Sequence, residues 1–278
     1  MINRILRKIR YFYRGNDVNH FHDYPLGREP QATKEEYMAI WNEAKRKSYP
    51  KIDEYENKLQ YRINDQWLHQ LALHTQVVIK ESEICYQHGR LLYAFLSDYV
   101  QKNEISTINI IETGTARGFS TLCMAKALQD QKVEGKIVTI DPIPHNMRMY
   151  WNCIDDLDSA KSRVELLGDY IDLINRYILF IEGKTEDTLD NIELSRIHFA
   201  FLDGAHTYDE VKNEVSYIIK RQKKGDLIFF DDYQEVYFPG IVKVVKELKL
   251  NRKYQVLIIK VNDQRGYAIG KKLESKIV

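Results

Sequence analysis

Short apolar runs alternate with helix-length amphipathic segments from about residue 108 to the end of the chain. Seven of these runs have the length and the β-branched or aromatic content typical of strands. They span 108–112, 136–141, 178–182, 198–203, 226–231, 255–261 and 266–270. This alternation predicts an α/β fold in which helices cover both faces of a mostly parallel sheet. Only residues 262–265 join the last two runs, which predicts a hairpin and an antiparallel last strand.

The N-terminal part of the chain carries helical rather than strand patterns. Thr33 followed by Glu36 is a capping box, which predicts that a helix begins there. Further helical periodicity covers 64–79 and 83–100. We therefore divide the chain into a helical N-terminal extension, 1–102, and a domain that contains the sheet, 103–278.

Residues 1–14 combine basic side chains with apolar residues at helical spacing, which predicts a basic amphipathic helix. Such a helix can lie on an anionic membrane surface. It can equally pack on the domain or on a second subunit, with its basic face in solvent. Both alternatives stay open, and they predict two partners, a peripheral membrane contact and a homodimer.

The composition excludes several classes of protein. Hydrophobic residues make up 44% of the chain, and 41 basic side chains balance 40 acidic ones to a net charge of +1. We therefore expect a sizeable core and no nucleic-acid partner. Three scattered cysteines without CxxC spacing indicate a reducing compartment and argue against disulfides and a zinc site. No apolar run has the length of a transmembrane helix, so we predict a cytoplasmic protein, with peripheral association at the inner membrane surface left open.

The most informative segment is Ile108-Asn-Ile-Ile-Glu-Thr-Gly-Thr-Ala-Arg-Gly118. It predicts a buried strand that ends at Glu112 and a glycine turn that opens a helix. Gly114 and Gly118 permit tight backbone geometry close to a ligand. The Glu-x-Gly-x-x-x-Gly spacing differs from the Gly-x-Gly-x-x-Gly of dinucleotide-binding folds. Taken alone, an ordinary strand-to-helix turn would look the same.

Acidic residues follow three of the later strands. Asp141 ends the second strand, where a carboxylate can accept both hydroxyls of a ribose or simply start a turn. Asp203 follows the fourth strand, and Asp231 and Asp232 follow the fifth. Because the carboxyl ends of parallel strands share one rim, these last three side chains can converge beside His206.

Three converging carboxylates repel one another unless protons or a cation neutralise them. Oxygen ligands suit a hard divalent ion such as Mg²⁺, which can lower the pKa of a bound hydroxyl. His206 can then accept the proton, since histidine titrates near neutral pH. The plainer interpretation is that His206 bonds to backbone and that Asp231 and Asp232 cap a turn.

These motifs carry a family resemblance. The segment 108–118 is similar to the first motif of class I S-adenosylmethionine (SAM) dependent methyltransferases. The pattern Asp-Gly-x-His-x-Tyr-x-x-Val-x-x-Glu over 203–214, with Gly-Asp-x-x-x-x-Asp-Asp-Tyr over 225–233, resembles the methyltransferase 24-like family. That family is similar in motif style to metal-dependent sugar O-methyltransferases. The resemblance begins at about Ile108 and implies a Rossmann-like fold with seven strands.

The resemblance also implies roles for individual residues. The implied cofactor-binding residues are Glu112, Gly114, Thr115, Gly118, Asp141, Lys184, Thr185 and Asp203. Within this set, Asp141 would bind the ribose and Thr185 can alternatively cap a helix. The implied metal ligands are Asp203, Asp231 and Asp232, and the implied catalytic residues are His206 and Asp203. The sugar enzymes often have another acid where this chain has Ala205-His206, so the metal is less secure than the cofactor.

We therefore predict a SAM-dependent O-methyltransferase that acts on a hydroxyl of a sugar or glycan precursor, either a small molecule or lipid-linked, with His206 as base and optional help from Mg²⁺. One alternative is a non-catalytic scaffold, which would predict a degraded cofactor loop. Another is a NAD-dependent oxidoreductase, which would need a Gly-x-Gly-x-x-Gly loop and a Tyr-x-x-x-Lys pair. The insertion 144–156 has two interpretations, the apolar face of an extra helix or a cover over the cofactor or acceptor.

Overall fold

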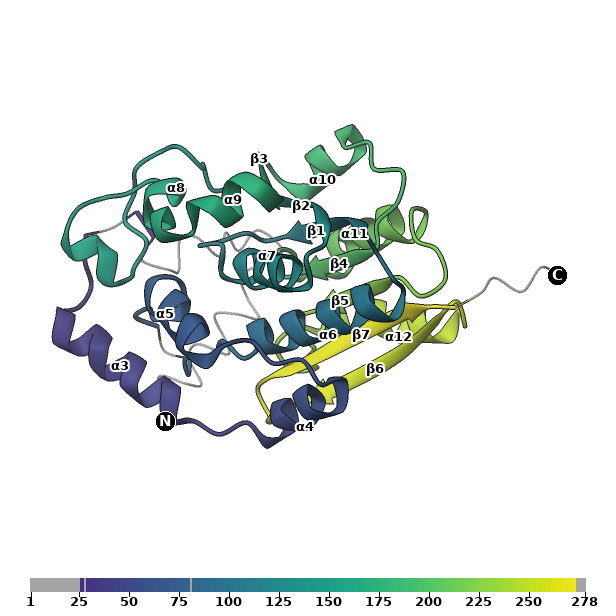
Figure 1. The fold of residues 1–278 in the computed structure, drawn as a ribbon, viewed down its shortest axis with the longest axis horizontal. Coiled ribbons are helices and arrows are strands. Elements are labelled where there is room, and N and C mark those ends of the chain that lie inside the picture. Colours follow the sequence, from purple (N-terminus) through teal and green to yellow (C-terminus); the bar gives the residue numbers. More distant parts are fainter. Residues whose placement is uncertain (1–25, 28, 81, 274–278) are drawn as a thin grey trace.

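A seven-stranded sheet forms the centre of the computed structural model, which describes residues 26–27, 29–80 and 82–273 (Figure 1). The strands lie in the order β3-β2-β1-β4-β5-β7-β6. The first five strands are parallel, whereas β7 runs antiparallel to both β5 and β6. The predicted fold class and closing hairpin are therefore confirmed. The strand bounds are β1 Thr107–Thr113, β2 Glu134–Asp141, β3 Ile178–Glu182, β4 Phe199–Leu202, β5 Leu227–Phe230, β6 Tyr254–Lys260 and β7 Gly266–Lys272.

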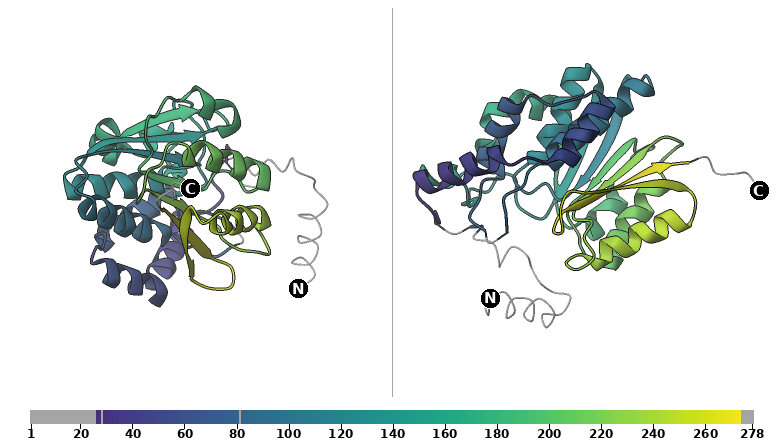
Figure 2. Two further views of the ribbon diagram at one scale, coloured as in Figure 1. Left: turned by 90° about the vertical axis from the view of Figure 1, so that its right-hand side faces the viewer. Right: turned by 90° about the horizontal axis from the view of Figure 1, so that it is seen from below.

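Helices cover both faces of the sheet, and Figure 2 shows the purple-to-teal helices on one side and the green-to-yellow helices on the other. The α-helices are α3 Lys34–Arg46, α4 Pro50–Leu59, α5 Asp65–Thr75, α6 His88–Lys102, α7 Phe119–Gln131, α8 Arg163–Leu166, α9 Ile171–Tyr177, α10 Thr185–Thr188, α11 Tyr208–Ile219 and α12 Pro239–Leu250. Within the described ranges, no helix is both long and apolar enough to cross a membrane.

Strand residues alternate between two apolar cores. Ile110 contributes to the core beneath α4 to α7 and α9, and its neighbour Ile111 contributes to the core beneath α11 and α12. The same alternation separates Phe201 from Leu202 in β4. Because successive strand side chains point to opposite faces, a strand of continuous apolar residues can serve both cores.

The N-terminal extension packs as part of the first core. Leu68 and Leu71 of α5 are fully buried in the same cluster as Phe119 of α7. The predicted capping box is confirmed, because the Thr33 hydroxyl accepts from Glu36 N–H at the start of α3. The helix predicted over 1–14 lies outside the described residues.

The insertion at 144–156 does not form the extra helix. Its regular structure is one 3₁₀ turn, Ile154–Leu157, and an isolated bridge between Met149 and Lys161. Trp151 is fully buried and donates from its indole Nε1 to the Lys161 carbonyl at 2.7 Å. The apolar residues of the insertion therefore anchor a loop beside the carboxyl end of β2.

Gly89 lets α6 approach α7 closely, since a Cβ built on it would lie 2.7 Å from Cys123 Sγ and 2.7 Å from the Phe119 ring. We expect Gly89→Ala to destabilise the fold by ~1–3 kcal/mol through overpacking. Urea denaturation would measure the loss. Gly168→Ala is the matched control, because a Cβ at Gly168 meets nothing within 4 Å. Equal stability of both variants would contradict the close approach.

Candidate functional site

Glu112, the last acidic residue of β1, has a fully buried side chain. Its carboxylate accepts hydrogen bonds from the hydroxyls of Ser120, Thr121 and Thr139. Burial raises its pKa from 4.5 to about 7, although these three hydroxyls act in the opposite direction. Glu112 therefore fixes the following loop from beneath, joining β1 to β2 and to the first turn of α7.

The loop from 114 to 118 has a backbone that only small residues permit. Gly114 has a φ of +88°, and a Cβ there would lie 2.4 Å from the Asp203 carbonyl oxygen. Gly118 has a φ of +86° and is the N-cap residue of α7, where no side chain caps the helix. Thr115 is buried and its hydroxyl bonds to that of Thr139 at 2.5 Å. The loop is therefore held close against both β2 and the end of β4.

Asp141 ends β2 and fastens the same loop from the other side. Its carboxylate accepts from Ala116 N–H and from Ile143 N–H, each at 2.7 Å. The buried guanidinium of Arg163 lies 3.4 Å from it and also donates to the Ala116 carbonyl at 2.8 Å. Burial raises the pKa of Asp141, and Arg163 opposes that shift. Arg163 is a residue that the sequence analysis missed.

Lys184 and Thr185 follow β3, whose last residue, Glu182, pairs in register with Asp141. Lys184 is exposed and forms a 3.7 Å ion pair with Glu186. Thr185 is the first residue of α10, so it does not cap that helix. The structure places both residues after β3, the strand next to β2, and their cofactor-binding role stays a prediction.

The ends of β4 and β5 bring acidic residues and a histidine together. Ligand atoms of Asp203, His206 and Asp232 all lie within 4.8 Å of one another. His206 Nε2 is 3.2 Å from Asp232 Oδ2, and the imidazole ring packs on Phe238 with centroids 4.6 Å apart. We call Asp203, Asp231 and Asp232, together with His206, the rim cluster.

Arg265, which precedes β7, also reaches the rim cluster and was missed from the sequence. Its Nη1 donates to Asp231 Oδ1 at 3.2 Å and to Asp232 Oδ1 at 3.0 Å. The hairpin is fixed there because Tyr233 N–H donates to the Gly266 carbonyl at 2.9 Å. The sequence did contain a signal for this contact, namely the predicted antiparallel last strand. Such a strand, paired with the strand that precedes Asp231, brings its first residues beside the acids.

Burial raises the pKa of Asp203 well above its usual value, and the nearby carboxylates of Asp231 and Asp232 raise it further. Burial also raises the pKa of Asp231, to about 6, against the charge of Arg265. Burial also acts to raise the pKa of Asp232, but the hydrogen bond from His206 and the positive charge of Arg265 outweigh burial. The pKa of Asp232 is therefore lowered. The cluster thus contains carboxyls of unequal acidity.

Two basic side chains of the N-terminal extension influence the cluster. Burial lowers the pKa of Lys80 to about 8, Arg265 lowers it further, and the charge of Asp232 opposes the shift. Burial lowers the pKa of His88 to about 3, and its ring lies parallel to Phe201 at a centroid distance of 6.2 Å. Burial thus disfavours the charged form of Lys80 and Asp232 favours it, whereas His88 stays neutral.

Of the three predicted metal ligands, only Asp203 and Asp232 lie in a group that could hold an ion. Asp231 directs its carboxylate to Arg265 and to the N–H of Asp232, while His206 takes its place beside Asp203 and Asp232. Mg²⁺ prefers an all-oxygen shell, and imidazole ligands are more typical of transition metals. Arg265 already supplies positive charge to two of the acids. The residues present therefore fit Mg²⁺ poorly, and we assign no step to it.

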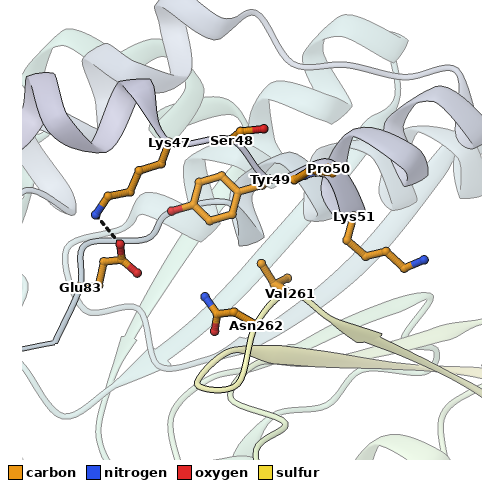
Figure 3. Close-up of a pocket in the computed structure, with 8 residues that line it drawn as sticks. All are labelled: Lys47, Ser48, Tyr49, Pro50, Lys51, Glu83, Val261 and Asn262. Carbon is orange, nitrogen blue, oxygen red and sulfur yellow. Dashed lines mark ion pairs between the residues drawn. The ribbon is translucent and has the colours of Figure 1, made fainter.

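One cavity, of about 290 Å³, lies between the N-terminal extension and the closing hairpin. It is lined by Tyr49 and Lys51 at the start of α4 and by Asn262 of the hairpin (Figure 3). A second cavity, of about 530 Å³, is lined by residues of the extension, among them Lys80 and several apolar side chains. Lys47 and Glu83 line both cavities and form a 2.5 Å ion pair.

Comparison with known sequences covers the central part of the chain. The family model Methyltransf_24, described as "Methyltransferase domain", matches residues 111–233. The chain is also 26% identical over 182 residues to the uncharacterized protein R132 of Acanthamoeba polyphaga mimivirus, with 60% of this chain and 74% of that protein covered. The matched family segment contains the loop after β1 and all the acids of the rim cluster.

Two solved structures have a similar fold. One is the O-methyltransferase TomG from Streptomyces achromogenes in complex with SAM, with a TM-score of 0.55, 16% identity, and 77% of this chain and 92% of that chain covered. The other is cofactor-bound Rv0187 from MTB, with a TM-score of 0.55, 16% identity, and 83% and 100% covered. At this level of identity the likeness concerns the fold.

Burial of Glu112 makes a pH-dependent contribution to stability. Its folded-state pKa, about 7, lies above its usual 4.5, so the contribution is present below pH 4.5 and is lost as the pH rises through 7. In Glu112→Gln the amide cannot ionise, so we expect wild type to lose on the order of 3 kcal/mol more than this variant between pH 4.5 and 8. Urea denaturation across this range would measure the difference.

Glu186→Gln is the control, because its carboxylate is half exposed on α10 and should leave the wild-type pH profile unchanged. Parallel profiles for wild type and Glu112→Gln would contradict the buried, proton-binding state of Glu112.

Proposed function

We propose that this chain is a class I methyltransferase and that it transfers a methyl group from SAM to a hydroxyl of a sugar or glycan precursor. The observation that carries the proposal is the pairing of a glycine loop after β1 with a carboxylate and histidine cluster on the same rim of the sheet. The glycine loop is suited to binding a cofactor, and the carboxylate and histidine cluster is suited to activating the acceptor.

The loop residues fit SAM. The positive φ angles at Gly114 and Gly118 let the loop pack closely against Asp203 and Leu167, and the N-terminus of α7 has no side-chain cap. Backbone N–H groups at a helix N-terminus bind carboxylates, so this end of α7 would hold the methionine carboxylate. Asp141 would accept from the ribose hydroxyls. When bound, SAM supplies an electrophilic methyl group on its sulfonium.

The rim cluster would prepare the acceptor. His206 would accept the proton of the acceptor hydroxyl, and Asp232, 3.2 Å from its Nε2, would orient the imidazole and stabilise its protonated form. Asp203 would hold the acceptor hydroxyl near the loop, since its carbonyl oxygen lies 2.4 Å from a Cβ built on Gly114. In this proposal, proton transfer and methyl transfer take place side by side.

The sugar acceptor rests on the family resemblance. A lipid-linked acceptor, a membrane contact through 1–14, a homodimer and a cytoplasmic location stay predictions. No observation favours a NAD-dependent oxidoreductase, and the intact loop argues against a non-catalytic scaffold.

We expect Asp141→Ala to weaken binding of S-adenosylhomocysteine (SAH) by about tenfold or more, because it removes charged acceptors for the ribose and for the loop. Isothermal titration would measure the affinity. Asp172→Ala, at an exposed position of α9, is the control and should bind like wild type. Equal affinities in both variants would remove Asp141 from the site. If the folded wild-type protein does not bind SAH, the result would favour a non-catalytic scaffold over a methyltransferase.

We expect His206→Gln to slow methyl transfer by roughly 10²- to 10⁴-fold, because glutamine cannot accept the proton. Its affinity for SAH should stay within the error of wild type. Release of SAH with a panel of nucleotide sugars and lipid-linked sugars would give the rate. The matched control is His74→Gln, since His74 forms a similar pair with Asp155, at 2.6 Å, outside the rim cluster. An unchanged rate in His206→Gln would exclude it as the base.

A further inference from the structure

We propose that Arg265 takes the place of a divalent metal ion in the rim cluster, so that the protein itself supplies the compensating positive charge. The charge assignment follows from contacts in the structure alone. Only its consequence for the acceptor rests on the proposed function.

The contacts of Arg265 occupy the carboxylate oxygens that an ion would need. Both oxygens of Asp231 lie within 3.5 Å of Arg265 Nη1, and Asp231 Oδ1 also accepts from the N–H of Asp232. Asp232 directs one oxygen to Arg265 and the other to His206. A metal ion bound by Asp232 would have to share these oxygens with a guanidinium or an imidazole, and the guanidinium would repel it.

The charge balance points the same way. Asp203, Asp231 and Asp232 carry three negative charges when all are ionised, and Arg265 places one positive charge against two of them. The field that would attract a divalent ion is thereby reduced, since an opposite charge nearby cancels part of it. A guanidinium stays protonated at any physiological pH, so Arg265 is a permanent part of this balance.

The fold holds Arg265 in place. Its side chain is 21% exposed, and that of Asp231 is 3% exposed. The hairpin that carries Arg265 is tied to the acids through the Tyr233–Gly266 backbone bond, and a Cβ on Gly266 would lie 2.6 Å from the Tyr233 carbonyl oxygen. The backbone that carries Arg265 is therefore fixed beside the acids, and most of the side chain is already buried there.

For the proposed reaction, Arg265 is then a positioning residue. It holds Asp232, which in turn holds His206, and it does so without metal exchange. Methyl transfer would accordingly be insensitive to chelators, and cation binding would be a property that the protein gains only when Arg265 is removed.

The test is Mn²⁺ binding, followed by electron paramagnetic resonance of free Mn²⁺ and by isothermal titration, on wild type and on Arg265→Met. We expect no saturable binding by wild type up to millimolar Mn²⁺. In Arg265→Met we expect affinity to rise by about tenfold or more. Adding Asp232→Asn to that variant should abolish the gained site. Arg265→Gln, which keeps a polar side chain, gives the same test if the methionine variant does not fold.

Arg196→Met is the matched control, because Arg196 makes a similar two-bond contact, to Asp226 at 2.8 and 3.2 Å, away from the rim cluster. It should gain no Mn²⁺ site. Saturable Mn²⁺ binding by wild type that Asp232→Asn removes would overturn the proposal, as would folded Arg265 variants that gain no site. SAH binding, measured on the same samples, separates this result from a failure of the proposed function.

Discussion

Repulsion among the carboxylates at the ends of β4 and β5 is the constraint on which the site depends. Parallel strands deliver Asp203, Asp231 and Asp232 to one rim, and such a cluster needs compensating charge. The closing hairpin supplies this charge, because antiparallel pairing brings Arg265 beside Asp231 and Asp232. The last two strands are thus electrostatic as well as packing partners of the parallel strands.

The loop after β1 is built by a different principle. Here the acids are neutralised locally, because Glu112 accepts from three hydroxyls and Asp141 accepts from two backbone N–H groups beside Arg163. Hydrogen bonds of this kind offset the cost of burying a carboxyl and leave the loop with one conformation. One half of the rim is therefore rigid and suited to a cofactor, while the other half contains groups that can exchange protons.

Much of this architecture could be predicted from the sequence. Strand positions follow from the apolar runs, and the capping box at Thr33 placed the start of α3. The charged partners could not be predicted in the same way, since Arg163 and Arg265 meet their acids through contacts between residues far apart in the chain. The helix α4 was missed because Pro50, at its first turn, reads equally well as a break. At 144–156 tertiary burial of Trp151 overrode the helical spacing of the apolar residues.

The most direct test of this account is a crystal structure of the protein grown with SAH and Mn²⁺, with anomalous data collected at the manganese absorption edge. The account predicts SAH along the loop from 114 to 118, with its ribose at Asp141, and Arg265 on Asp231 and Asp232 with no anomalous peak between them. A manganese peak bound by Asp232, with Arg265 turned away, would contradict the protein-supplied charge. SAH lying elsewhere would contradict the cofactor site.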